Sequence, residues 1–398
     1  MKKSILLTLV LFLTAGIITK TKAIPSFARK YGISCQICHT PSIPKLKPYG
    51  DDFAGDGFRL QDYKSPRYFI EAGDTKLSLL RNLPIAVRMD GHVMYNQTGD
   101  ENSDWGTPYL MKLLSGGEIS KKFSYYFYFY MDEKGEVVGV EDAYLMYNNL
   151  FGQNLDLYFG QFQVSDPLFK RELRLSLEDY QIYKTKIGLS DINLTYDKGL
   201  MLTYGLPTKT DIIFQVVNGN GLGNAEDDHL FDKDQYKSFA GRITQDIGEF
   251  FRIGGFAYYG KEKLTFTNID ETNEVLYYGP DFSASYNDIL ELNVQYMMRN
   301  DNNVFVQVPT GTILSEIETQ GGLAEIIYAP KGDQSDWYLK ALYNWVDSEW
   351  DGADYQTATF HFGYLLRRNL RIAAEYTYDM SVSGNEFSRY SIGFVSGF

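Results

Sequence analysis

The two cysteines of this chain stand next to one of its four histidines, in the octapeptide ISCQICHT at residues 33–40. In a C-x-x-C-H arrangement, Cys35 and Cys38 can add to the two vinyl groups of a haem, while His39 ligates the iron on one face. The same residues could instead form a redox dithiol, a disulfide or half of a zinc site. A thioredoxin-like dithiol should follow a βαβ pattern, and a structural zinc site needs further ligands, commonly a second cysteine pair. The sequence supplies neither, so it predicts one covalent haem c, with Cys35 and Cys38 as thioether residues and His39 as axial ligand.

The ligand on the other face of the iron is left open by the sequence. Methionine at this position raises the haem potential and a second histidine lowers it. Met89, His92 and Met94 fall on a predicted strand over residues 83–96, where alternation places His92 and Met94 on one face and Met89 on the other. These three residues are the candidate distal ligands. The alternatives are a packing role for the methionines and a polar, lumen-facing role for the histidine.

The N-terminus has the pattern of a secretory signal peptide over residues 1–23. A basic pair precedes an apolar run from Ile5 to Ile18, and Ala23 ends a small-residue cleavage signal. The apolar run is shorter than the roughly 20 residues that a membrane-spanning helix needs. The pattern predicts export, which is the route on which c-type haem is attached.

The remainder of the chain has the composition of a β-barrel membrane protein. Aromatic residues make up 16% of the sequence, with 32 Tyr and 26 Phe, and polar and apolar residues alternate over most of its length. Barrel strands carry a weak hydropathy signal, because every second residue faces a polar lumen. The net charge of -13 argues against nucleic acid as a partner and favours cations.

Candidate strands can be counted back from the C-terminus, and short linkers alternate with longer ones between them, as in outer-membrane barrels. The longer linkers, predicted as external loops, include residues 163–197, 261–274 and 300–320. The sixteen predicted strands span residues 83–96, 108–119, 122–131, 138–148, 153–162, 198–206, 209–217, 236–246, 250–260, 275–285, 288–299, 321–330, 336–347, 354–366, 369–380 and 389–398. The prediction is an all-β, 16-stranded (range 14–18) antiparallel outer-membrane barrel over residues 81–398, preceded by a small c-type monohaem segment over residues 24–80 that plugs the lumen.

The residues around the haem motif resemble the opening of the fused monohaem cytochrome-porins, a family that includes outer-membrane iron oxidases. That opening reads P-x-F-A-R-x-x-G-x-x-C-x-x-C-H, then P-x-L-x-x-[FY]-G, then F and a G-[YF] pair. The matching residues here are Pro25, Phe27, Ala28, Arg29, Gly32, Cys35, Cys38, His39, Pro44, Leu46, Tyr49, Gly50, Phe53, Gly57 and Phe58. This sequence departs from the family at Lys30 and Tyr31, where Gln-Thr is more usual, and at Asp51 and Asp52, in place of a basic residue.

The resemblance implies an outer-membrane electron carrier that takes electrons from an extracellular donor, Fe(II) in the iron oxidases, and passes them to periplasmic c-type cytochromes. An activity as an Fe(II) oxidase would follow from that role. Two alternatives stay open, a solute-diffusion porin with a haem plug and electron export to an extracellular acceptor. Acidic groups in predicted external loops suit a divalent cation, although they also solvate any barrel. These groups are Asp100, Glu101, Asp104, Glu226, Asp227, Asp228, Asp232 and Asp234.

Overall fold

A computed structural model describes residues 26–60, 69–70, 73–74, 76–80, 83–97, 102–225, 228–232, 234–382 and 386–398. The predicted signal peptide lies outside the described residues. Among the helices that are described, none is both long and apolar enough to cross a membrane.

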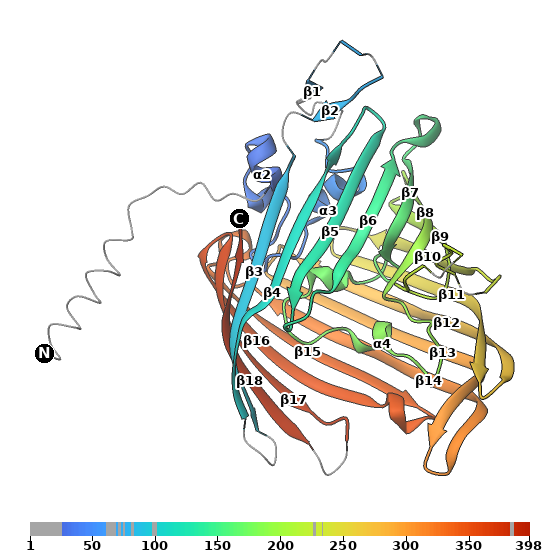
Figure 1. Ribbon diagram of the computed structural model, residues 1–398. Coiled ribbons are helices and arrows are strands. Elements are labelled where there is room, and N and C mark those ends of the chain that lie inside the picture. Colours follow the sequence, from blue (N-terminus) through green and yellow to red (C-terminus); the bar gives the residue numbers. More distant parts are fainter. Residues whose placement is uncertain are drawn as a thin grey trace, which may run out of the picture.

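Sixteen antiparallel strands form a closed barrel, which confirms the predicted count (Figure 1). The last strand pairs with the first, with Ile392 opposite Val93. The strands are β3 (Ile85–Gln97), β4 (Asn102–Glu118), β5 (Phe123–Glu133), β6 (Gly139–Tyr147), β7 (Leu155–Gln163), β8 (Tyr196–Leu206), β9 (Thr210–Val217), β10 (Ser238–Ile247), β11 (Phe251–Phe266), β12 (Ile269–Tyr286), β13 (Leu290–Val308), β14 (Gly311–Tyr328), β15 (Trp337–Ser348), β16 (Tyr355–Arg367), β17 (Leu370–Asp379) and β18 (Phe387–Gly397).

The two ends of the barrel differ. Short turns such as Arg368-Asn369 join strands at the end where the chain terminates, called here the short-turn end, and the opposite end is called the hairpin end (Figure 1). Two of the predicted external loops are strand hairpins instead, which corrects that part of the prediction. Residues 261–274 and 300–320 continue as paired strands and turn only at Thr267-Asn268 and Pro309-Thr310. Alternation does not reveal where a strand leaves the membrane, so the sequence could not separate these extended hairpins from loops.

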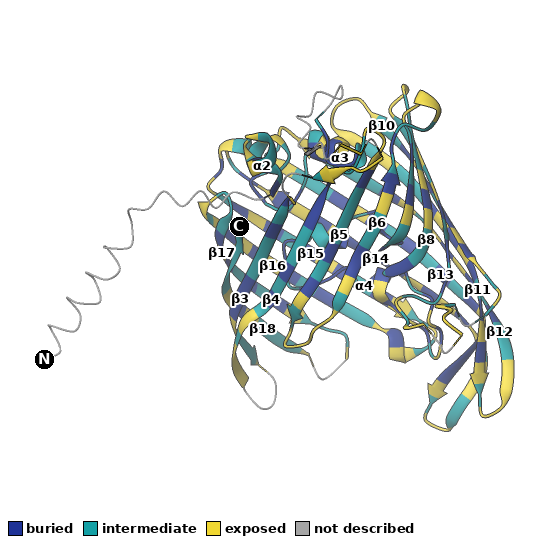
Figure 2. Cartoon of the chain, turned by 45° about the horizontal axis from the view of Figure 1, so that its top comes forward, coloured by how far each residue is buried: buried dark blue, intermediate teal, exposed yellow. Residues whose placement is uncertain are grey.

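The two faces of the barrel wall differ in polarity. Along β17, Arg371 and Glu375 are buried inside whereas Ile372 is exposed outside, and Figure 2 shows buried and exposed positions alternating along the strands. Large apolar side chains exposed on the outer wall include Phe239, Ile243, Ile253, Leu276, Val294, Ile326, Leu339, Phe360, Phe362, Ile372 and Ile392. An apolar outer face with a polar inner face is what a lipid-embedded barrel requires.

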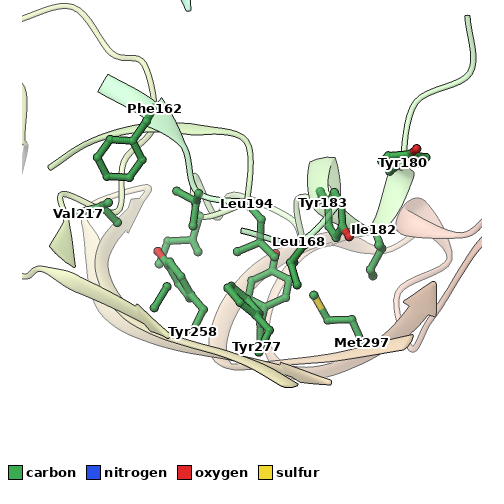
Figure 3. Packing of buried hydrophobic residues seen from close by; sticks show 14 of the residues in the cluster. Phe162, Leu168, Tyr180, Ile182, Tyr183, Leu194, Val217, Tyr258, Tyr277 and Met297 are labelled. Carbon is green, nitrogen blue, oxygen red and sulfur yellow. The ribbon is translucent and has the colours of Figure 1, made fainter. Parts of the chain in front are cut away.

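The long segment between β7 and β8, residues 164–195, folds into the lumen and is called here the internal loop. It was predicted as an external loop, and that prediction is wrong. Leu168, Ile182, Tyr183 and Leu194 pack on lumen-facing wall residues, including Tyr258, Tyr277 and Met297 (Figure 3). The loop contains the 3₁₀ turn η4 (Arg171–Leu173) and the helix α4 (Gln181–Lys184). Burial of its apolar side chains against the wall stabilises it there.

The N-terminal segment, residues 26–60, lies at the short-turn end and contains α2 (Ser26–Tyr31), η1 (Cys35–Ile37) and α3 (Pro48–Gly55) (Figure 1). Its core is aromatic: the rings of Phe27 and Phe58 stack 4.8 Å apart, and Phe53 meets both edge-on. Phe58 also stacks 5.1 Å from Tyr126 on the barrel wall. The remaining short elements are β1 (Phe69–Ile70), β2 (Leu79–Leu80), η3 (Leu150–Gly152), η5 (Gly332–Gln334) and η6 (Asp351–Ala353).

Candidate functional site

The C-x-x-C-H motif forms one tight turn of chain. Ser34 begins the turn, because its hydroxyl accepts a hydrogen bond from the Gln36 backbone N–H at 3.3 Å. The backbone N–H of His39 donates to the Cys35 carbonyl at 2.9 Å, which brings both cysteines and the histidine to one side of the segment. The two thiols do not form a disulfide, and burial raises the pKa of each. A reactive redox dithiol needs the opposite shift.

The imidazole of His39 is oriented by backbone carbonyls. Its Nδ1 donates to the Pro44 carbonyl at 3.0 Å and lies 3.3 Å from the Lys45 carbonyl. This interaction leaves Nε2 as the ring nitrogen with a free lone pair, and burial lowers the His39 pKa, so the ring is neutral at neutral pH. A neutral imidazole whose other nitrogen bonds a carbonyl is the usual state of a metal-ligating histidine.

The structure shows why residue 50, which follows the C-x-x-C-H motif, is a glycine. The backbone of α3 approaches the haem-motif turn so closely that a Cβ on Gly50 would lie 2.2 Å from the Cys38 carbonyl oxygen. The Lys47 N–H, just before α3, donates to the same carbonyl at 2.9 Å. A side chain at position 50 would therefore separate α3 from the motif.

A cavity of about 320 Å³ opens beside Cys35, Cys38 and His39. Its volume falls in the lower part of the range for sites of small molecules and cofactors. Apolar side chains from the N-terminal segment and the wall make up most of its lining: Phe27, Ile33, Ile43, Pro44, Leu46, Phe53, Phe58, Leu114, Leu365, Leu370 and Val395. Three tyrosines and several charged groups complete it: Tyr126, Tyr128, Tyr144, Arg88, Asp142, Asp166, Lys170, Glu172, Arg368 and Arg371.

These residues fit a haem. Two thiols and an imidazole with a free Nε2 lie along one side of an apolar cavity, which matches thioether attachment and axial ligation. In addition, the guanidinium of Arg371 lines the cavity with all three nitrogens buried and without a hydrogen-bond partner. A buried cation of this kind suits a ligand that is apolar and carries acidic groups.

The candidate distal ligands lie elsewhere. His92 lines a second, smaller cavity of about 40 Å³, together with His361. Both ring nitrogens of His92 are buried without a partner. Met89 and Met94 line neither cavity. The structure therefore does not bring these three residues to Cys35, Cys38 and His39, and the identity of the distal ligand stays a prediction without a test.

Ion pairs tie the N-terminal segment to the barrel. Lys45 Nζ lies 2.6 Å from Glu325 on β14, and Lys47 pairs with Asp333 in the adjacent short turn. Glu325 also accepts a hydrogen bond from Tyr180 of the internal loop at 2.9 Å. One buried carboxylate thus connects the wall, the internal loop and the segment that carries the motif.

The acidic groups of the predicted external loops serve local structure where they are described. Asp104, Asp228 and Asp234 each accept a backbone hydrogen bond from a neighbouring residue, and Asp232 pairs with Lys237. In the part of the chain that the structure describes, no group of three or more His, Cys, Asp or Glu side chains could hold a metal ion. Asp100, Glu101, Glu226 and Asp227 lie outside the described residues.

Several cavity residues escaped the sequence-based prediction. Strand alternation places Arg371, Tyr126 and Tyr128 on the lumen side, so the sequence pattern alone could have identified these three as lumen residues. Asp166 and Lys170 come from the internal loop, whose entry into the lumen was not expected. Which lumen residues meet around one cavity depends on the register of the closed barrel, and one sequence does not contain that information.

No protein-family model and no curated protein matches this chain. Solved structures do match. The outer-membrane channel DcaP of Acinetobacter baumannii is 15% identical, covers 80% of this chain and 97% of its own, and superposes with a TM-score of 0.55. The barrel is porin-like.

Two further structures support that likeness. The anion-selective porin of Comamonas acidovorans is 11% identical, covers 80% of this chain and 99% of its own, and gives a TM-score of 0.53. Salmonella typhi OmpF is 15% identical, with coverages of 79% and 97% and a TM-score of 0.53. At these identities the likeness concerns the fold. The resemblance to fused cytochrome-porins stays a prediction.

Proposed function

We propose that this chain is an outer-membrane electron-transfer protein that carries one covalent haem c at the short-turn, periplasmic end of a porin-like barrel. The observation that carries the proposal is the cavity of about 320 Å³ in which Cys35, Cys38 and His39 meet, with the His39 Nδ1 engaged by a carbonyl and Nε2 free. The donor would be extracellular Fe(II), as a substrate, and the acceptor a periplasmic c-type cytochrome.

The residues of the chain bind and shield rather than react. Haem supplies reversible one-electron chemistry, so no acid or base is required. His39 would ligate the haem iron, while Phe53 and Phe58 of the N-terminal segment and Leu114 of the wall would limit water. Lys45 ties the segment to the wall through Glu325. Solvent exclusion and nearby charges would then set the potential.

Haem staining of a denaturing gel tests the attachment. Protein expressed with the c-type maturation machinery should give a haem-positive band, and the Cys35→Ala/Cys38→Ala variant should give a barrel of equal heat resistance without stain. An unstained band from the native protein would contradict the electron-transfer proposal. It would not affect the assignment of the barrel fold.

Stopped-flow reduction of the oxidised protein tests the donor. We expect Fe(II) to reduce the haem faster than a non-metal reductant of similar potential. Reduction by the non-metal reductant alone would exclude iron oxidation. Rapid electron release to an extracellular acceptor from the reduced protein, without uptake from Fe(II), would favour export.

A solute-diffusion porin is the second candidate, and the likeness of the barrel to solved channels favours it. Against it, the internal loop and the N-terminal segment occupy parts of the lumen, with Ile182 and Lys45 both buried against the wall. Conductance of the full chain in planar bilayers separates the two functions. A diffusion porin would give steady, porin-sized open channels, whereas the electron-transfer protein would give little or no conductance.

A further inference from the structure

Arg371 on β17 is a buried arginine without a partner. Its side chain lines the larger cavity, the residue is 4% exposed, and Nε, Nη1 and Nη2 all lack a hydrogen-bond acceptor. The four other buried arginines among the described residues all donate hydrogen bonds. Arg59 donates to backbone carbonyls, and Arg171, Arg242 and Arg299 donate to aspartates.

The wall carboxylates close to Arg371 are already engaged. Asp90 is near enough for Arg371 to influence it, but its two oxygens accept hydrogen bonds from Arg88, at 3.0 Å from Nε and 2.5 Å from Nη2. Glu375 accepts hydrogen bonds from His361 Nδ1 at 2.9 Å and from the Leu177 N–H at 3.0 Å. Neither carboxylate accepts a hydrogen bond from the Arg371 guanidinium.

The residues around Arg371 indicate which kind of ligand could pair with its positive charge. Leu365 and Val395 stand directly opposite Arg371 on the two neighbouring strands, and both line the same cavity. A buried guanidinium in an apolar setting is costly unless an anion pairs with it, and guanidinium groups bind carboxylates in a bidentate manner. The ligand that matches this cavity is therefore apolar over most of its surface and carries a carboxylate.

We propose that Arg371 binds a carboxylate of the cavity ligand, and that for a haem held by Cys35 and Cys38 this carboxylate is a propionate. The inference rests on the proposed function. Arg368, in the turn just before β17, is a second donor on the same hairpin, since its Nη1 is also buried without a partner and it lines the same cavity. The barrel wall would thus hold the carboxylate end of a haem that is covalently attached to the N-terminal segment.

Pairing with Arg371 keeps the propionate ionised. An opposite charge at contact distance lowers a carboxyl pKa by about 1–3 units. Replacing Arg371 with a neutral side chain of similar length should raise the propionate pKa by the same amount and make its protonation visible near neutral pH.

The test is an infrared pH titration of the haem-loaded protein, with haem isotope-labelled at its propionate carboxyls so that side-chain carboxyls do not interfere. Arg371→Met and Arg371→Gln should each show the protonated-acid band at a pH about 1–3 units higher than the native protein. Arg371→Lys should restore much of the native behaviour. Arg367→Met is the matched control, because Arg367 lies on the same hairpin, is exposed and does not line the cavity.

The outcomes separate the two proposals. Native titration in both neutral Arg371 variants, with barrels that keep their heat resistance, would overturn the role of Arg371 while leaving the haem in place. Absence of covalent haem from the native protein, measured first by its pyridine haemochrome spectrum, would overturn the proposed function. Two neutral variants are used so that misfolding of one does not decide the result. The infrared band is that of the labelled propionate, so it reports the protonation of this group directly.

Discussion

At the scale of single residues, Gly50 decides how closely α3 approaches the haem motif. We expect Gly50→Ala to destabilise the N-terminal segment by about 1–3 kcal/mol, since the added Cβ would lie 2.2 Å from the Cys38 carbonyl oxygen and force the backbone apart. Thermal melting followed by Soret circular dichroism measures this. Gly55→Ala on the same helix is the control, because a Cβ there meets nothing within 4 Å. Equal melting of both variants would contradict the role of Gly50.

A second residue, Asp166, should make the haem potential depend on pH in the haem-loaded protein proposed above. It lines the larger cavity, and burial raises its pKa to about 6, although Lys170 opposes the shift. Deprotonation adds a negative charge that stabilises the ferric state, so the midpoint potential should fall as pH rises through about 6. At an effective dielectric constant near 20, two charges roughly 8–16 Å apart interact by about 1–2 kcal/mol. Asp166→Asn should remove this step in a spectroelectrochemical titration, and an unchanged step in the variant would rule Asp166 out as its source.

Among the elements, the internal loop is bound to β13 by a buried arginine, Arg299. Arg299 Nη1 donates to the carbonyls of Thr185 at 2.8 Å and Ile192 at 3.0 Å, while Nε pairs with Asp301 at 2.6 Å. Arg299→Met removes these bonds and leaves Asp301 buried without its partner, which costs about 3–5 kcal/mol. We expect the loop to leave the wall.

Trypsin provides the measurement for that variant, because Lys184 and Lys186 lie within the internal loop. Arg299→Met should be cut there, and the native chain should resist. Arg242→Met is the matched control: it breaks a buried wall ion pair with Asp281 without removing a hydrogen bond to the loop. Cleavage of both variants at the same rate would mean that wall stability, rather than anchoring, protects the loop.

The same elements show how far the sequence could lead. All sixteen strands were predicted from period-two alternation, because each strand faces lipid on one side and the lumen on the other. The alternation pattern predicts residues 163–197 as an external loop, because it carries no information about where a connecting segment goes. The large apolar side chains of Ile182 and Tyr183 in this segment are the sequence feature that indicates its burial in the lumen. The cavity could not be predicted, because His39 and Arg371 meet only through the closed barrel.

For the whole molecule, the site lies near one end of a lumen that is partly filled by protein. The cavity beside His39 and the smaller cavity beside His92 share Arg88, Glu172 and Val395 in their linings, so they adjoin along the wall. The hydrocarbon core of a bilayer is about 30 Å thick, too wide for an electron to cross unaided. On the proposed function, an extracellular donor would therefore have to enter the lumen from the hairpin end, and the internal loop lies on that route.

The outer wall of the molecule should tolerate charge at the hairpins but not in the middle of the strands. Phe360 is central in β16 and 59% exposed, whereas Ile269 is 53% exposed at the tip of the β11–β12 hairpin. Arg at the bilayer midplane costs about 2–4 kcal/mol and roughly 0–1 kcal/mol near the interface. Phe360→Arg should lower the free energy of unfolding from lipid vesicles, measured by urea titration of tryptophan fluorescence, while Ile269→Arg should leave it within about 1 kcal/mol. Equal losses at the two positions would mean that the lipid-facing belt lies elsewhere on the barrel. The cavity beside Cys35, Cys38 and His39 would then lie at a different depth relative to the membrane surface.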